Sequence, residues 1–172
     1  MQRLDVTPWL QDGAIDVSFE GTMAASYQLE LSGFRAREVE DQPALALELT
    51  YDHPTLSVDD AITAKLTASY QRPGASGMVL ISAAIPPGFE PLTEDLQALV
   101  SEGHIAKYTS DGKEVRLYLD RLKQDLPVSF EYHLRAKFPV KAIAPASRAY
   151  LYYQPEIAAE SKAVPLIVAV RR

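Results

Sequence analysis

The residue types most often used in active sites are few in this sequence, and their spacing does not suit catalysis. The three histidines, His53, His104 and His133, share no i, i+4 spacing and have no acid at a metal-ligand spacing. The absence of cysteine excludes disulfides, thiol catalysis and cysteine metal sites. The sequence therefore predicts that the chain is not an enzyme and holds no metal or cofactor.

Two short stretches resemble functional motifs only in part. Residues 74–78, GASGM, begin like the turn that carries a nucleophilic serine, but Met78 stands where the last glycine of that motif belongs. Asp59 and Asp60 are adjacent acids, whereas a calcium site needs several oxygen ligands within one loop. We interpret Asp59 and Asp60 as a turn that leads into a strand.

The tyrosines are the more informative side chains. The stretch SRAYLYYQPE places Tyr150, Tyr152 and Tyr153 within four residues. Adjacent residues of a strand point to opposite faces, so we expect at least one of these tyrosines at the surface or in an interface. Tyrosine favours interfaces because one end of its ring is apolar and the other is polar. The alternative is a core strand in which one tyrosine reaches solvent with its hydroxyl group.

Charge and hydropathy exclude two classes of partner. The net charge is −6, and residues 1–42 hold 3 Lys+Arg against 8 Asp+Glu. An acidic chain of this kind lacks the basic face of a nucleic-acid binder, and the basic bias after Pro127 reads as a solvated strand face. No apolar run approaches the roughly 18 residues of a membrane span, and residues 1–13 lack the apolar segment of a secretory signal.

Apolar and polar residues alternate along most of the chain, as in strands with one buried face. The residues expected on inner faces from residue 45 onward are Leu45, Leu47, Leu49, Tyr51, Ile62, Ala64, Leu66, Ala68, Tyr70, Val115, Leu117, Leu119, Phe130, Tyr132, Leu134, Ala136 and Phe138. Turn residues separate these runs, and Asp111-Gly112 is a strong hairpin signal. The pattern predicts an all-β fold, an antiparallel β-sandwich.

One segment has helical periodicity instead. In PLTEDLQALVSEG, the apolar residues Leu92, Leu96, Leu99 and Val100 form a single stripe, which predicts a helix of about ten residues. Thr93 is the expected N-cap, Glu94 and Asp95 suit the helix dipole, and Gly103 is placed to end the helix. Just before it, Pro86-Pro87-Gly88 must stop a strand, because proline cannot donate to a sheet. We therefore expect a short crossover helix over one end of the sandwich.

Several of these blocks together resemble a known family. The blocks GMVLISAAIPPGFEPL, KYTSDGKEVRLYLDRL and VSFEYHLRAKFPVKAIAPASRAYLYYQPE are similar in order and spacing to the C-terminal receptor-binding domain of the alpha-2-macroglobulin family. This resemblance covers residues 43–172. The hairpin pattern GAIDVSFEGTMAASYQLELSGF resembles the returning half of the family's CUB domain and assigns residues 1–36 to a CUB-like segment.

The resemblance implies a protease-trapping inhibitor in which this chain is a non-catalytic C-terminal domain. In the family, a cleaved bait region and an internal Cys–Gln thioester capture the protease, and this chain contains no cysteine. In animal relatives, two helix lysines bind a clearance receptor, and the matching positions here are Thr93 and Gln97, with Glu94 adding negative charge. The absence of cysteine and asparagine, together with the stretches IPPGFEP and YYQPE, resembles bacterial members. This resemblance implies a periplasmic or envelope-attached protein (secreted if eukaryotic).

The resemblance also sets expectations for partners and contact residues. The partners it implies are the other domains of the parent chain and the proteases that the full-length protein traps, and the domain is expected to be a monomer. Our candidate contact residues are Thr93, Glu94 and Gln97 on the helix, and Tyr150, Tyr152 and Tyr153 on the tyrosine strand.

A rival hypothesis is a free-standing β-sandwich that serves in adhesion or carbohydrate binding, because sandwiches host many functions. An exposed Tyr152–Tyr153 surface beside a groove would favour this rival. A flat polar surface around the helix, with an acidic edge at the hairpin, would favour the protease-trap domain.

Overall fold

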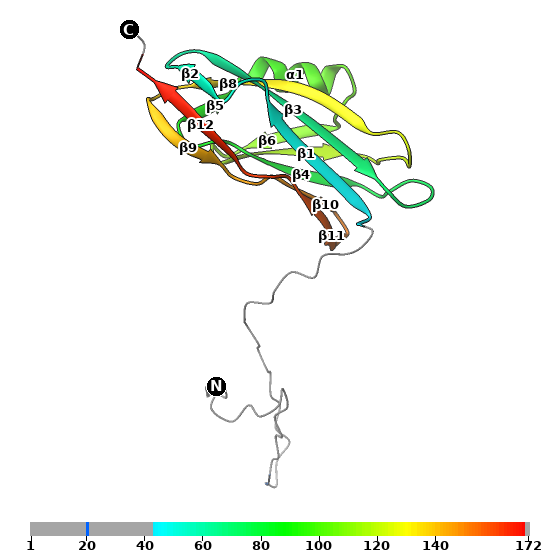
Figure 1. Ribbon diagram of the computed structural model, residues 1–172. Helices are drawn as coiled ribbons and strands as arrows, with labels where there is room; N and C mark the ends of the chain where they lie inside the picture. The colour runs from blue at the N-terminus through cyan, green and yellow to red at the C-terminus, as the bar shows by residue number, and fades with distance from the viewer. Residues whose placement is uncertain (1–19, 21–42, 171–172) are drawn as a thin grey trace. The chain divides into compact units, whose positions relative to one another are not determined.

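Three β-sheets and one helix form the part of the chain that the structure describes, which is residue 20 and residues 43–170 of a computed structural model (Figure 1). The CUB-like segment 1–36, with its predicted hairpin, lies outside the described residues. The sheets and the single helix confirm the predicted all-β sandwich with one crossover helix.

A four-stranded antiparallel sheet forms one layer of the sandwich. Its strands, in spatial order, are β1 (Leu45–Tyr51), β3 (Ala61–Tyr70), β8 (Val128–Ala136) and β5 (Phe89–Pro91). The predicted inner faces are confirmed along β1, β3 and β8 up to Ala136. The prediction for Phe138 is wrong, because β8 ends at Ala136 and the backbone N–H of Lys137 then donates to the carbonyl of Gly88. Phe138 is 64% exposed.

A five-stranded antiparallel sheet forms the second layer. Its strands, in spatial order, are β11 (Gln154–Glu160), β10 (Arg148–Leu151), β4 (Val79–Ala84), β7 (Glu114–Leu119) and β6 (Lys107–Ser110). The β6–β7 hairpin has the predicted turn, with Gly112 at φ 81°. Leu117 and Val115 point inward and join the residues of the first sheet in one apolar core.

A three-stranded sheet completes the fold near the C-terminus (Figure 1). It consists of β2 (Thr55–Ser57), β12 (Val164–Ala169) and β9 (Val140–Ala144), with β12 in the middle. β2 runs parallel to β12, and β9 runs antiparallel to it. As predicted, Asp59 and Asp60 form the turn that leads into β3, and Asp59 adopts a left-handed conformation.

The Pro86-Pro87-Gly88 stretch carries the chain from one sheet to the other. Ile85 ends its run with a backbone hydrogen bond to Lys113, and Phe89 then starts β5 in the opposite sheet with its side chain buried. Gly88 has φ +85°, and a Cβ there would lie 3.1 Å from Cγ1 of Val140. Glycine is required here both for its backbone conformation and for the close approach of Val140.

Helix α1 (Thr93–Ser101) then returns the chain from β5 to β6, as the crossover prediction required. The N-cap prediction is wrong: Leu92 occupies that position, and no side chain caps the helix. The N–H of Leu92 donates to the carbonyl of His133 in β8, which holds Leu92 in an extended conformation. The helix therefore begins at Thr93, which is its first helical residue and not its N-cap. Gly103 ends the helix as predicted, with its N–H bonded to Val100 and that of His104 bonded to Leu99, the pattern of a Schellman motif.

The core contains one buried polar atom without a partner among the described residues, the hydroxyl oxygen of Tyr51. Its ring lies at the end of β1 and packs against the core. Burial raises the pKa of Tyr51 to about 12, because the surroundings disfavour a phenolate. Burial also raises the pKa of Tyr132, a fully buried core residue of β8.

Tyr51→Phe should leave the free energy of unfolding unchanged or raise it by up to about 1 kcal/mol. The substitution keeps the ring and removes a hydroxyl group that gains no hydrogen bond in the fold. Urea denaturation measures the change, with Tyr153→Phe in an exposed turn as the control that should show none. A loss of more than about 1 kcal/mol would mean that the Tyr51 hydroxyl has a partner, such as a buried water.

Candidate functional site

The outward surface of α1 carries the first group of candidate contact residues. Thr93, Glu94 and Gln97 are all exposed, while Leu96 and Leu99 face the core. These three side chains therefore form a polar surface with one negative charge and no lysine. This surface can form hydrogen bonds with a polar partner, and it offers no positive charge to an acidic one.

Asp95 fastens this helix to the four-stranded sheet. Its Oδ2 accepts a hydrogen bond from the backbone N–H of His133 at 2.8 Å and lies 2.7 Å from the Nδ1 of the same residue. The sequence indicated Asp95 only as an acid that suits the helix dipole, and His133 only as a histidine without an acid at a metal-ligand spacing. The pair was missed because the two residues are 38 positions apart and nothing in the local pattern of either one points to the other.

The three tyrosines occupy two different environments. Tyr150 lies in β10, whereas β10 ends at Leu151 and leaves Tyr152 and Tyr153 in the turn before β11. The premise that Tyr152 and Tyr153 alternate along a strand is therefore wrong, and both are exposed, at 46% and 77%. Their rings meet edge to face with centroids 5.1 Å apart, and the N–H of Tyr152 donates to the carbonyl of Met78.

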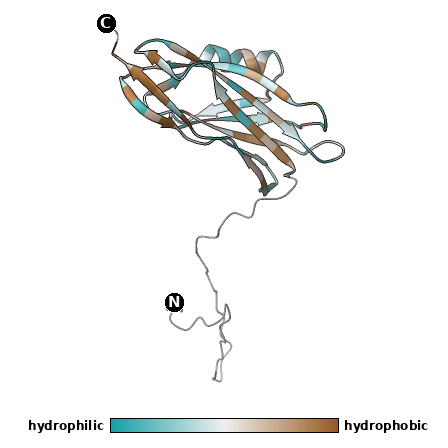
Figure 2. Ribbon diagram, viewed as in Figure 1, coloured by the Kyte–Doolittle hydropathy of each residue, from teal (hydrophilic) through white to brown (hydrophobic). Residues whose placement is uncertain are grey.

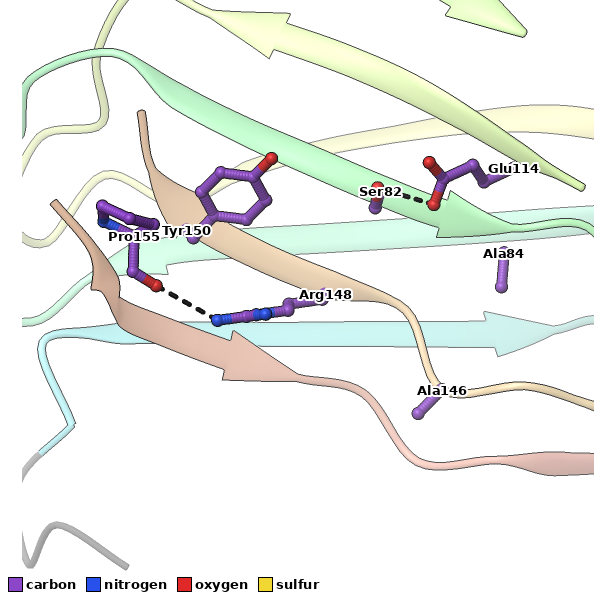
Figure 3. Close-up of a pocket in the computed structure, with 7 residues that line it drawn as sticks. All are labelled: Ser82, Ala84, Glu114, Ala146, Arg148, Tyr150 and Pro155. Carbon is purple, nitrogen blue, oxygen red and sulfur yellow. Dashed lines mark hydrogen bonds between the residues drawn. The ribbon is translucent and has the colours of Figure 1, made fainter. Parts of the chain in front are cut away.

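A groove of about 450 Å³ lies on the outer face of the five-stranded sheet (Figure 3). Its lining residues are Ser82, Ala84, Glu114, Ala146, Arg148, Tyr150 and Pro155. β4 contributes the small side chains of Ser82 and Ala84, while the larger ones of Glu114 and Arg148 come from the strands on either side. Of the three candidate tyrosines, only Tyr150 lines this groove, so the exposed Tyr152–Tyr153 pair is not part of it.

Hydrogen bonds hold both polar walls of the groove in place. On one side, Glu114 accepts hydrogen bonds from the hydroxyl group of Ser82 at 2.8 Å and from Nε of Arg116 at 2.6 Å. On the other side, an Arg148 guanidinium nitrogen donates to the carbonyl of Pro155 at 3.1 Å, and the guanidinium lies over the ring of Tyr150 (Figure 3). The groove thus presents a carboxylate paired with Arg116 opposite the guanidinium of Arg148, an arrangement suited to a small polar ligand.

Asp111 extends this network at the β6–β7 turn. Its Oδ1 accepts hydrogen bonds from the backbone N–H groups of Lys113 and Glu114, both at 3.0 Å, and its Oδ2 is 3.3 Å from Arg116. The two backbone hydrogen bonds, chiefly that from Lys113, lower the pKa of Asp111 below its ordinary value of 3.8, and the Arg116 charge adds to the effect.

Asp111→Asn should lower the free energy of unfolding at pH 7 and have a smaller effect near pH 3. The carboxylate has a depressed pKa in the fold, so its stabilising contribution is complete above 3.8 and is lost as the pH falls through the folded value. Asparagine keeps an acceptor for the turn but removes the charge beside Arg116. Urea denaturation across this pH range checks the difference, and an effect independent of pH would contradict the role of the charge.

The described residues offer little for metal or membrane chemistry. No group of three or more His, Asp or Glu side chains within them is placed to hold a metal ion. Each histidine instead lies beside a carboxylate: His53 by Asp52, His104 by Glu102, and His133 by Asp95. Within the same residues, no helix has the length and apolar character that a membrane crossing requires.

Comparison with known proteins identifies similar sequences and folds. Residues 74–163, a little over half of the chain, match the family described as A-macroglobulin receptor binding domain. The crystal structure of Salmonella alpha-2-macroglobulin reacted with methylamine is similar with a TM-score of 0.63 and 16% identity, over 74% of this chain and 9% of that one. Native alpha-2-macroglobulin from Escherichia coli, spanning domain MG7 to the C-terminus, gives 0.62 and 16%, over 74% of this chain and 24% of that one.

A cryo-EM reconstruction of native Escherichia coli alpha-2-macroglobulin also matches, with a TM-score of 0.62 and 16% identity, over 78% of this chain and 10% of that one. At this identity, the likeness to solved structures establishes a common fold. The chain spans between about a tenth and a quarter of the length of these relatives.

Proposed function

The chain belongs to the A-macroglobulin receptor binding domain family, and from this premise we propose that it is the C-terminal domain of a bacterial alpha-2-macroglobulin-like protease inhibitor. The match over residues 74–163 is the observation that carries this proposal. It runs from before β4 to the residues after β11, so it includes the helix, the groove and the tyrosine turn. The similar fold of two bacterial alpha-2-macroglobulins supports it.

In this proposal the domain makes contacts and performs no catalysis. The contact residues we propose are Thr93, Glu94 and Gln97 on α1, and Tyr150, Tyr152 and Tyr153 around the tyrosine turn, facing other domains of the parent chain. Tyr152 and Tyr153 support this role because both rings are exposed at the end of a strand. The absence of lysine at positions 93 and 97 argues against the receptor binding of animal relatives.

The wider setting follows from the same premise. We propose a periplasmic or envelope-attached parent protein that encloses proteases, with residues 1–36 as the returning part of its CUB domain and this unit acting as a monomer. The rival function, an adhesion or carbohydrate-binding module, is supported by the groove beside Tyr150 and Arg148. It receives less support because the exposed Tyr152–Tyr153 pair does not line that groove.

A protease-protection assay tests the proposal. Trypsin is incubated with the 172-residue chain, or with the product of the complete natural gene, and then given a small chromogenic substrate or a large protein substrate. We expect the complete product to block cleavage of the large substrate while leaving the small one accessible. The isolated chain should protect neither. The proposed role would be contradicted if the isolated chain protected the large substrate selectively. It would also be contradicted if the complete product gave the large substrate no protection.

A further inference from the structure

The outer face of the three-stranded sheet carries exposed apolar residues, with Lys141 of β9 and Thr55 and Ser57 of β2 beside them. Four residues form what we term the outer strip: Ile143 of β9, and Pro165, Ile167 and Ala169 of β12. Ile143 lies directly opposite Pro165 in the β9–β12 ladder. The exposed fractions of Ile143 and Ile167 are 65% and 42%. Figure 2 shows the hydrophobic colouring that follows β12 and β9.

The outer face of the four-stranded sheet shows that this fold does not require exposed apolar residues on the outer face of a sheet. The four-stranded sheet presents mainly charged and hydroxyl side chains to solvent, namely Glu48, Thr50, Thr63, Lys65, Thr67, Ser129, Glu131, His133 and Arg135. Among the described residues, the outer face of the three-stranded sheet has Lys141 as its single charge. Contiguous exposed apolar residues with a polar rim are typical of a protein–protein contact.

The strip, and not the neighbouring strand edge, is the part suited to a partner. β9 is an edge strand of only five residues, with Lys141 near its start and Pro145 directly after it. Short strands, edge lysines and prolines oppose the addition of another strand. A partner would therefore pack onto the side chains of the strip and would not extend the sheet.

The small size of the strip identifies the kind of partner. A stable complex between separate chains uses about 20–30 residues on each side, far more than the four residues of the strip. A domain on the same polypeptide is present at an effective concentration on the order of millimolar, so a small apolar contact is enough to hold it. Relatives of similar fold extend well beyond the region matched here, which supplies such domains.

We propose that the outer strip is the docking surface for another folded domain of the same parent polypeptide, which presents an apolar patch of its own. This inference rests on the proposed function, since it requires a longer parent chain. It assigns a contact role to a face that contains none of the helix or tyrosine residues considered above.

Site-specific thiol labelling tests this docking surface, because the chain has no cysteine of its own. Ile143→Cys and Ile167→Cys are made separately in the 172-residue chain and in the complete gene product, and the rate of maleimide labelling is followed by mass spectrometry. We expect labelling of both positions to be at least about tenfold slower in the complete product, as a contact that is closed more than nine-tenths of the time would give. Glu131→Cys, on the outer face of the four-stranded sheet, is the matched control and should react at similar rates in both proteins.

Other results would overturn the inference. Equal labelling of positions 143 and 167 in the two proteins would mean that no domain covers the strip. If labelling of the isolated chain becomes slower as the concentration of that chain rises, the partner is a second copy of the chain instead. The trypsin assay separates these failures from that of the proposed function: a complete product that protects large substrates but leaves the strip reactive refutes only the docking surface. A natural gene that encodes no further domain refutes both.

Discussion

Leu96→Ala should lower the free energy of unfolding by about 2–5 kcal/mol, the range for removing a buried leucine side chain. Leu96 is 1% exposed and lies on the inner face of α1. The helix has nine residues and lacks a side-chain N-cap, and isolated helices of that length are marginal in water. Packing of Leu96 and Leu99 must therefore supply most of the stability of this crossover.

Urea denaturation followed by tyrosine fluorescence measures this loss, with Gln97→Ala as the matched control. Gln97 is exposed on the same helix, so its replacement should change the free energy of unfolding by less than about 0.5 kcal/mol. A loss below about 1 kcal/mol for Leu96→Ala would mean that the helix detaches locally without affecting the sandwich. Comparable losses for the two variants would contradict the assignment of the buried face.

The large elements of this fold were predictable because strands with one buried face leave a period-two record in the sequence. β8 illustrates this, since Phe130, Tyr132 and Leu134 are buried as the alternation requires. The helix was predictable for the same reason, from its stripe of apolar residues. The match over residues 74–163 confirms the family resemblance.

The errors occur where elements end, because strand ends depend on contacts made between distant segments. Phe138 continues the alternation of β8, yet Lys137 bonds to Gly88, and the chain turns away. Tyr152 and Tyr153 continue the apolar run of β10 but lie in a turn, with the N–H of Tyr152 bonded to Met78.

The candidate site was less predictable than the fold. Tyr150 was identified from the sequence, but Ser82, Glu114 and Arg148 come together with it only through the pairing of β4 with β7 and β10. Each is an ordinary polar residue on the outer side of a strand, and nothing in its local pattern marks it. The outer strip was missed for a related reason, since exposed and buried isoleucines look alike until the strand register is known.

Three hydrogen bonds close the fold where β4, β10 and β11 approach one another, and Ser147 takes part in all of them. Ser147 is fully buried, and its Oγ accepts a hydrogen bond from the N–H of Ala84 at 2.9 Å. Its own N–H donates to Oγ of Ser161, whose N–H donates back to the carbonyl of Ser147. β10 begins at Arg148, opposite Ser82, so no residue of β10 is left to pair with Ala84.

Ser147→Ala should therefore lower the free energy of unfolding by about 1–3 kcal/mol, because it leaves the N–H of Ala84 without its partner. Ser161→Ala should have a similar effect through the N–H of Ser147, and Ser129→Ala, on an exposed strand face, should cost less than about 0.5 kcal/mol. Urea denaturation of both single variants and the double variant completes the test. Because the two serines share one hydrogen-bonded unit, we expect a coupling energy of at least about 0.5 kcal/mol. Strictly additive losses would mean that each serine acts alone. A negligible loss for Ser147→Ala would mean that a water molecule, entering from the groove that Ala84 lines, replaces the hydroxyl group.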